Sequence, residues 1–245
     1  MTAVPLLECR DLGVTYGDVI ALHGCTFEAG RGEFVGIIGP NGSGKSSLFK
    51  SLAGFVAHSG EVFLEGVCCH REPRTRIACI PQRSDVDFEF PISVGQLVTS
   101  GRRPYHRWFQ RPSAQDRLIA TEALERVGLG AFEHRSLSEL SGGQAQRVLI
   151  ARALAQQADV LLLDEAMSGV DFAATESLVE LFAELARSGA LVMVSTHDLG
   201  LARHHFDRVI ALNGAVIADG SPHEVLTLET LERVFGSSPH RHADD

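Results

Sequence analysis

The sequence lacks any apolar stretch that approaches the ~20 residues needed to span a lipid bilayer. Its first residues also lack the charged segment and following apolar run of a secretory signal peptide. We therefore expect a chain with no membrane span of its own, which stays in the cytoplasm.

Cysteine is scarce, and its spacing is not that of a cross-linked or metal-bound framework. The five cysteines are odd in number and form no C-x-x-C pair, which argues against both a disulfide framework and a structural zinc site. We expect buried or idle thiols at these positions: Cys9, Cys25, Cys68, Cys69 and Cys79.

An excess of basic charge is also missing, since 22 Lys and Arg face 31 Asp and Glu for a formal net charge of −9. Such a molecule is a poor electrostatic match for nucleic acid, although a local basic patch could override the average. Apolar residues make up 44% of the 245 residues, which is ordinary for a globular protein with a sizeable core.

The first informative segment that is present is a phosphate loop. It fits the pattern G-x-x-x-x-G-K-[ST], in which glycines bring backbone N–H groups against phosphates, a lysine reaches the β/γ oxygens and a hydroxyl ligates Mg²⁺. An apolar run at 34–38 reads as a buried strand before it, and 46–53 reads as a helix that ends at Gly54. The loop residues are Gly39, Pro40, Asn41, Gly42, Ser43, Gly44, Lys45 and Ser46, with Ser47 next in the helix.

Hydrophobic patterns predict an α/β protein with two kinds of strand. Short runs at 6–12, 19–27 and 60–64 are separated by turn residues and indicate an antiparallel layer beside the phosphate loop. Continuous apolar runs at 160–163, 191–195 and 209–212 alternate with helical stretches, which is typical of parallel strands buried on both faces.

Between these halves, from about 83 to 157, helical signals replace strand signals. Ser113 is placed to cap a helix that carries Leu118, Ala120, Ala123, Leu124 and Val127, and Gly128 or Gly130 would end it. We therefore expect a helical insertion within the α/β core.

A second segment with an unusual helix start lies at Leu140, Ser141, Gly142, Gly143 and Gln144. Ser141 and Gln144 form a capping-box pattern before an amphipathic helix. That pattern does not explain two glycines in a first turn, which cost roughly 1 kcal/mol each relative to alanine. A glycine-lined helix N-terminus offers free N–H groups and the positive end of the helix dipole, so a terminal phosphate is its natural ligand.

The phosphate loop together with this second segment resembles the ATP-binding cassette (ABC) family of ATPases, over essentially the whole chain. The resemblance implies one ABC ATPase domain with a P-loop NTPase (RecA-like) core, a parallel sheet, an antiparallel β subdomain and an inserted α-helical subdomain. The core would span 1–82 and 158–235, the helical subdomain that carries the signature 83–157, and a polar tail 236–245.

The same resemblance implies a role for further residues. Tyr16 would stack on adenine, and Gln82 would touch Mg²⁺ and the attacking water. Asp164 would hold Mg²⁺ together with Ser46, and Glu165 would be the general base for that water. His197 would contact the γ-phosphate, and Asp171 lies in a segment that resembles the D-loop. Ala166 replaces the proline that commonly follows the acidic pair, without removing a catalytic group.

ATP and Mg²⁺ are therefore the implied ligands, and a second copy of the chain is the implied partner. In the family two cassettes stack head to tail, so that Ser141 and Gly143 of one subunit close over ATP held by the other's phosphate loop. Lys45 and Ser141 of one chain would then serve different ATP molecules.

The segment 81–94, with 101–103 and 109–113 beyond it, resembles the manganese and zinc uptake branch of the ABC importers, as do 204–209 and 234–236. This implies a separate integral membrane permease, an extracytoplasmic metal-binding protein, and a place at the cytoplasmic face of the membrane. Manganese, zinc and iron share ligand preferences, so the ion stays open. The permease would dock around 82–96, where Val86, Phe88, Phe90 and Ile92 alternate with acids.

Other functions remain as alternatives: an importer of another substrate such as chelated iron, a soluble ABC ATPase that acts on nucleic acid or ribosomes, or a nucleotide-binding scaffold with negligible turnover. Arginines and aromatics interleave at 102–111 and could bind single-stranded nucleic acid, but the net charge favours a solvated loop and no nucleic-acid partner. Regulatory metal binding is a minor alternative at Cys68, Cys69 and His70, and at His240 and His242.

Overall fold

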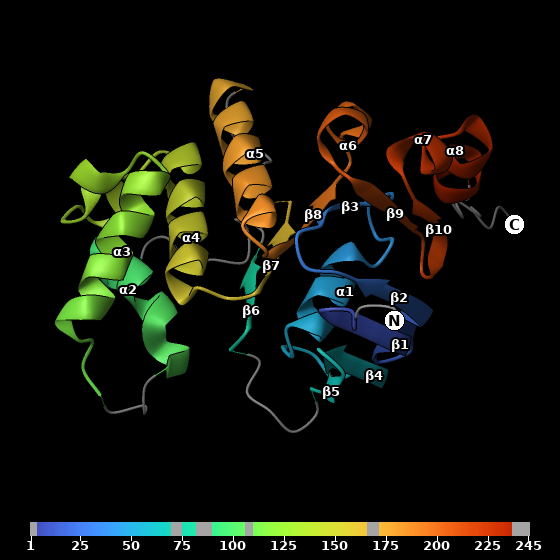
Figure 1. Cartoon of the computed structure of the whole chain (residues 1–245), viewed down its shortest axis with the longest axis horizontal. Helices are drawn as coiled ribbons and strands as arrows, with labels where there is room; N and C mark the ends of the chain where they lie inside the picture. The colour runs from blue at the N-terminus through green and yellow to red at the C-terminus, as the bar shows by residue number, and fades with distance from the viewer. Residues whose placement is uncertain (1–3, 70–74, 82–89, 106–109, 166–171, 237–245) are drawn as a thin grey trace, which may run out of the picture.

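The fold consists of two β-sheets with helices beside them and a further group of helices at one end of the molecule (Figure 1). This computed structural model describes residues 4–69, 75–81, 90–105, 110–165 and 172–236. Among those residues, no helix is both long and apolar enough to cross a membrane.

The smaller sheet is antiparallel and has the strand order β2-β1-β4-β5. Its strands are β1 (Leu7–Tyr16), β2 (Val19–Ala29), β4 (Ser59–Leu64) and β5 (Val67–Cys68). Buried and exposed residues largely alternate along β2, as in a sheet with one face on the core. This confirms the expected antiparallel layer.

The larger sheet has the order β10-β9-β3-β8-β7-β6, and its strands are parallel except for β10, which is antiparallel to β9. Its strands are β3 (Phe34–Ile38), β6 (Ile77–Ile80), β7 (Val160–Asp164), β8 (Leu191–Thr196), β9 (Arg208–Leu212) and β10 (Val216–Gly220). Every residue of β3, β7 and β8 is buried, as expected for strands covered on both faces. The edge strands β6 and β10 were not among the strands expected from the sequence.

The helical insertion is confirmed. It contains α2 (Val94–Thr99), α3 (Ala114–Arg126) and α4 (Gly142–Gln156), with 3-10 turns at Ser100–Tyr105, Gly130–Phe132 and Leu137–Glu139. Ser113 caps α3 as expected, through a bond from the Asp116 N–H to Ser113 Oγ of 3.1 Å. Leu118, one of the apolar residues that this helix carries, is 50% exposed.

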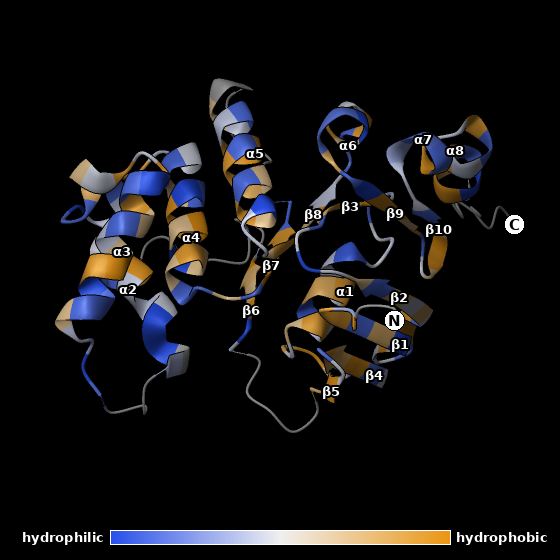
Figure 2. Ribbon diagram, viewed as in Figure 1, coloured by the Kyte–Doolittle hydropathy of each residue, from blue (hydrophilic) through white to orange (hydrophobic). Residues whose placement is uncertain are grey.

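The remaining helices are α1 (Lys45–Leu52), α5 (Phe172–Arg187), α6 (Leu199–His205), α7 (Pro222–Val225) and α8 (Leu228–Phe235). Two apolar clusters divide the interior. One packs α1 and the antiparallel sheet against one face of the large sheet, and the other packs α5, α6 and the helical group against the opposite face. Figure 2 shows β6 and β7 as largely hydrophobic, as this double coverage requires.

Candidate functional site

The phosphate loop joins β3 to α1, which begins at Lys45. Gly44 precedes the helix with φ of 97°, and a Cβ there would lie 2.4 Å from Leu22 Cδ2 and 2.7 Å from the Ala21 carbonyl oxygen. Only glycine fits this position, on both backbone conformation and space. The Leu48 N–H donates to the Gly44 carbonyl at 2.8 Å, so the N–H groups of Lys45, Ser46 and Ser47 come before the first donor of the helical ladder and have no intrahelical acceptor.

The Lys45 side chain is only 5% exposed and folds back over the loop. Its Nζ donates to the carbonyl oxygens of Gly39 at 2.8 Å and Pro40 at 3.0 Å. Burial lowers the pKa of Lys45, while the nearby carboxylates of Glu165 and Asp164 act in the opposite direction. The loop lysine and the acidic pair therefore share one site.

The loop also contains an unsatisfied polar atom. Ser43 Oγ is buried and has no hydrogen-bond partner within the part of the chain that the structure describes. Such a group normally has a partner in a native structure. An orphan hydroxyl, free helix N-terminal amides and a buried ammonium make a set of donors that fits the phosphates of a nucleotide.

Asp164 is the last residue of β7 and is 1% exposed. Its Oδ1 accepts a hydrogen bond from Ser195 Oγ of β8 at 2.8 Å, and Glu165 follows it directly. His197 comes just after β8 and is exposed. Because the sheet order is β3-β8-β7, the loop, His197 and the acidic pair lie at the carboxyl ends of three neighbouring parallel strands, where ligands bind in such sheets.

Tyr16 ends β1 and is 47% exposed, with Val19 and Ile20 exposed beside it in the same hairpin. The next residues of β2, Ala21 and Leu22, contact the phosphate loop at Gly44. The hairpin thus places an exposed aromatic ring on the strand pair that adjoins the loop.

The Ser141 segment begins α4 as the capping box predicts. The Gln144 N–H donates to Ser141 Oγ at 3.3 Å, and the Ser141 N–H donates to Gln144 Oε1 at 2.9 Å. Figure 1 shows α4 in the helical group at one end of the molecule, with β6, β7 and α5 between it and α1. One chain therefore does not bring this segment to its own phosphate loop.

Gln82, Asp171 and Ala166 lie outside the described residues, so their predicted roles stay predictions. Ser195, which touches both acidic residues, was not among the site residues expected from the sequence. Its signal was a hydroxyl at the end of an otherwise apolar strand, in Val192, Met193, Val194, Ser195.

Within the segment 102–111, where arginines and aromatics interleave, Arg102 makes contacts inside the protein. Arg102 donates to Asp116 Oδ1 at 3.1 Å and to the Ala155 carbonyl at 3.0 Å, and its guanidinium lies 4.4 Å from the Tyr105 ring centroid. These contacts leave Arg102 bound to the helical group rather than presented to a nucleic acid. Arg107, Trp108 and Phe109 lie outside the described residues.

Most of the described cysteines are buried thiols. Cys9, Cys25 and Cys69 are buried, and burial is the main cause that raises the pKa of Cys9 and of Cys79 to about 12. Within the described ranges, no three His, Cys, Asp or Glu side chains are grouped to hold a metal ion. His70, His240 and His242 are outside those ranges.

Comparison with known proteins decides the family. The model of the family described as "ABC transporter" matches residues 22–168, more than half of the chain. The chain belongs to the ABC transporter family. This ABC cassette is accordingly a nucleotide-binding ATPase, and its P-loop α/β fold agrees with the expected class.

Two curated relatives are similar over most of their length. The cassette is 41% identical to the manganese transport system ATP-binding protein MntA of Synechocystis sp., over 93% of this chain and 89% of that protein. It is 42% identical to the zinc transport system ATP-binding protein TroB of Treponema pallidum, over 94% of this chain and 86% of that protein.

Solved structures of ABC transporters have a similar fold. A transporter described as metal-chelate type, in an inward-facing conformation, matches with a TM-score of 0.82 at 27% identity, over 95% of this cassette and 89% of that chain. A dimeric bacterial ABC transporter cassette matches with a TM-score of 0.78 at 27% identity, over 88% of this cassette and 98% of that chain.

Proposed function

We propose that this ABC cassette hydrolyses ATP to power the import of a divalent metal ion, manganese, zinc or iron, through a separate membrane permease. The observation that carries the proposal is identity above 40%, over more than nine-tenths of the chain, to ATP-binding proteins of a manganese and a zinc transport system. The cassette would act at the cytoplasmic face of the membrane, bound to that permease.

The hydrolytic chemistry follows from the site. Lys45 and the amides at the start of α1 would hold the β- and γ-phosphates, and Ser46 and Asp164 would hold Mg²⁺, which usually binds through one or two protein ligands plus phosphates. When bound, Mg²⁺ neutralises charge that develops on the phosphate oxygens. The single buried carboxylate of Asp164 suits an Mg²⁺ ion that also binds phosphates better than a cage of several acids would.

Glu165 would accept a proton from a water molecule while the water oxygen attacks the γ-phosphorus. The bond from that phosphorus to the β–γ bridging oxygen breaks, and ADP leaves with both electrons of that bond. His197, exposed after β8, would contact the γ-phosphate, Gln82 would contact Mg²⁺ and the attacking water, and Asp171 would contact the nucleotide.

The site would be completed by a second copy of the chain. The separation of α4 from the loop within one chain, and the likeness to a dimeric cassette, support a head-to-tail pair in which Ser141, Gly142 and Gly143 close over the partner's ATP. Two such sites are equivalent by symmetry, so hydrolysis would open an interface and drive motion in a bound permease.

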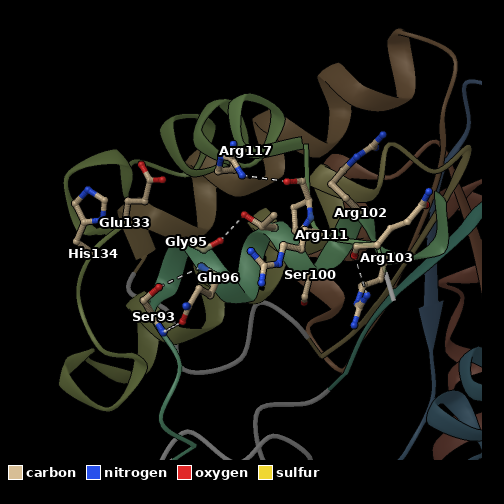
Figure 3. A pocket seen from close by; sticks show the side chains of 13 residues that line it. Ser93, Gly95, Gln96, Ser100, Arg102, Arg103, Arg111, Arg117, Glu133 and His134 are labelled. Atoms are coloured by element: carbon tan, nitrogen blue, oxygen red, sulfur yellow. Dashed lines mark hydrogen bonds between the residues drawn. The ribbon is translucent and has the colours of Figure 1, made fainter. Parts of the chain in front are cut away.

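The permease would dock on the helical group. A cavity of about 660 Å³ lies between α2, the 3-10 turn after it, and α3, beside the segment expected to dock the permease. Figure 3 shows Arg111 lying over α2 near Gln96 in this cavity. Phe90, just before α2, is 59% exposed and could pack against the same partner, while Val86 and Phe88 lie outside the described residues.

A transport assay tests the proposal. The cassette and its candidate permease are reconstituted into vesicles with the external binding protein, and ATP-dependent flux of ⁵⁴Mn, ⁶⁵Zn and ⁵⁵Fe is measured. We expect flux of at least one of the three ions with the unaltered cassette and none with Glu165→Gln. ATP hydrolysis without flux of any of the three ions would overturn metal import.

Glu165→Gln also tests the hydrolytic assignment alone. The amide cannot accept the proton from water, so we expect turnover to fall by at least about 10²-fold. ATP binding is retained, and the variant should accumulate as an ATP-bound dimer in size-exclusion chromatography. Hydrolysis at the unaltered rate would remove Glu165 from the role of base.

A further inference from the structure

Ser195 is a buried hydroxyl in an otherwise apolar strand. All six residues of β8 are buried, and Ser195 itself is 1% exposed between the central strands β3 and β7. The parallel register sets it opposite Asp164 on one side and Ile37 on the other. A hydroxyl in such surroundings must be hydrogen-bonded, because burying it unpaired is costly.

Both of its bonds go to the acidic pair. Ser195 Oγ donates to Asp164 Oδ1 at 2.8 Å and accepts from the Glu165 backbone N–H at 2.9 Å. A serine hydroxyl has one donor hydrogen and two acceptor lone pairs, so the two bonds are compatible. One atom therefore contacts two consecutive residues with different roles in hydrolysis.

The bond to Glu165 holds an uncommon backbone conformation. Glu165 has φ of 47°, in the left-handed region that non-glycine residues seldom occupy. At this point the chain leaves the β7 ladder, and the Glu165 N–H has Ser195 Oγ as its acceptor. Since side-chain direction depends on φ and ψ, this bond also helps to set where the Glu165 carboxylate lies.

The bond to Asp164 fixes the rotation of its carboxylate. A donor on one oxygen orients both oxygens, and a partner of this kind typically changes metal affinity or activity by 10–100-fold when it is removed. The bond therefore acts on the group that would hold Mg²⁺.

We infer that Ser195 is a positioning residue, whose hydroxyl couples the metal-binding carboxylate of Asp164 to the backbone that aims Glu165. The inference rests on the proposed ATP hydrolysis, in which Asp164 and Glu165 have those roles.

Ser195→Val and Ser195→Thr form a matched pair, because valine and threonine have similar shapes and both suit a strand, but only threonine keeps the hydroxyl. With Ser195→Val we expect kcat for ATP hydrolysis to fall about 10–100-fold. Mn²⁺ serves as a stand-in for Mg²⁺, and its affinity for the ADP-bound cassette is measured by electron paramagnetic resonance. With Ser195→Val we expect this affinity to fall by about tenfold or more. Ser195→Thr should stay within about threefold of the unaltered cassette in both measurements.

Ser51→Ala controls for the loss of a buried hydroxyl elsewhere. Ser51 is 0% exposed and donates to the Leu48 carbonyl at 2.8 Å within α1. We expect this variant to melt at a lower temperature with Mn²⁺ affinity unchanged. If Ser195→Val does not fold, Ser195→Ala replaces it as the variant without the hydroxyl.

The inference is wrong if Ser195→Val, folded, matches Ser195→Thr in kcat and Mn²⁺ affinity, because the hydroxyl would then be merely structural. Failure of the unaltered cassette to hydrolyse ATP would overturn the proposed function instead. In that case the Mn²⁺ affinity with ADP bound would still show whether the Ser195 hydroxyl positions the Asp164 carboxylate.

Discussion

At the residue scale, the positions of the candidate site residues in the fold were predictable wherever a residue belongs to a local sequence pattern. The phosphate loop and His197 follow buried parallel strands, Asp164 and Glu165 lie at the end of another, and the sheet order brings these strand ends together. Ser195 was not predictable in the same way. Its role depends on the register between β8 and β7, which sets Ser195 opposite Asp164. That register cannot be predicted from local sequence patterns.

Gly36 gives a residue-scale prediction about packing. A Cβ at this position of β3 would lie 2.2 Å from Phe206 Cδ2, and the Phe206 ring packs edge-on against Phe34 with centroids 4.8 Å apart. Gly36→Ala should therefore destabilise the cassette by about 1–3 kcal/mol through overpacking, measured by urea unfolding.

Phe206→Leu supplies the second-site control for Gly36→Ala. The smaller side chain vacates the space that the new methyl needs, so the double variant should lose less stability than the sum of the two single changes. Unchanged stability in Gly36→Ala alone would contradict the close packing of β3 against Phe206.

At the element scale, strands buried on both faces were predicted and edge strands were missed. The β6 segment, Ile77–Ile80, has only four residues and lies between Arg76 and Pro81, so its apolar run is too short to stand out. The β10 segment, Val216–Gly220, carries Asp219 and pairs antiparallel at the other edge. Both segments are strands because they pair with β7 and β9. Such pairing is tertiary context, which cannot be predicted from local propensity.

Four charged side chains join the two sheets at their ends. Arg31 and Arg76 each bridge Glu65, which follows β4, and Asp159, which precedes β7, with N–O distances of 2.6–2.9 Å. Burial alone would raise the pKa of Asp159, but the hydrogen bonds from Arg76 and Arg31 outweigh it and lower the pKa below its usual value of 3.8. The unfolded chain therefore binds this proton more readily than the folded one.

Asp159→Asn should lose stability that depends on pH. The contribution of the ionised carboxylate to the free energy of unfolding is fully present above pH 3.8. It is lost as the pH falls through the lowered pKa of the folded state. We expect a cost of about 0.5–1 kcal/mol near neutral pH, since the pair is partly exposed, and a smaller cost in acid. Urea unfolding at several pH values measures it. Glu122→Gln, on the exposed side of α3, is the control, and an equal cost of Asp159→Asn at all pH values would refute the linkage.

At the scale of the whole molecule, the proposed mechanism requires that two chains share each ATP. Within one chain, α4 belongs to the helical group while the phosphate loop lies beside the two sheets (Figure 1). Sequence motifs indicated two candidate half-sites, but the distance between them depends on where the helical insertion packs. The family resemblance, rather than any local pattern, suggested that the halves belong to different sites.

A mixing experiment tests this sharing directly, in a Glu165→Gln background so that bound ATP is not consumed. One tagged chain carries Lys45→Met, which removes the phosphate contact, and a differently tagged chain carries Ser141→Arg, which blocks closure over the nucleotide. If each site takes Lys45 from one chain and Ser141 from the other, the mixed pair keeps one intact site.

ATP-dependent co-purification of the two tags is therefore the deciding measurement. We predict that ATP pairs the two different chains, while each variant alone stays monomeric with ATP. Failure of the mixture to pair under conditions in which the Glu165→Gln cassette forms dimers, or ATP-driven pairing of the Ser141→Arg chain with itself, would contradict the shared site.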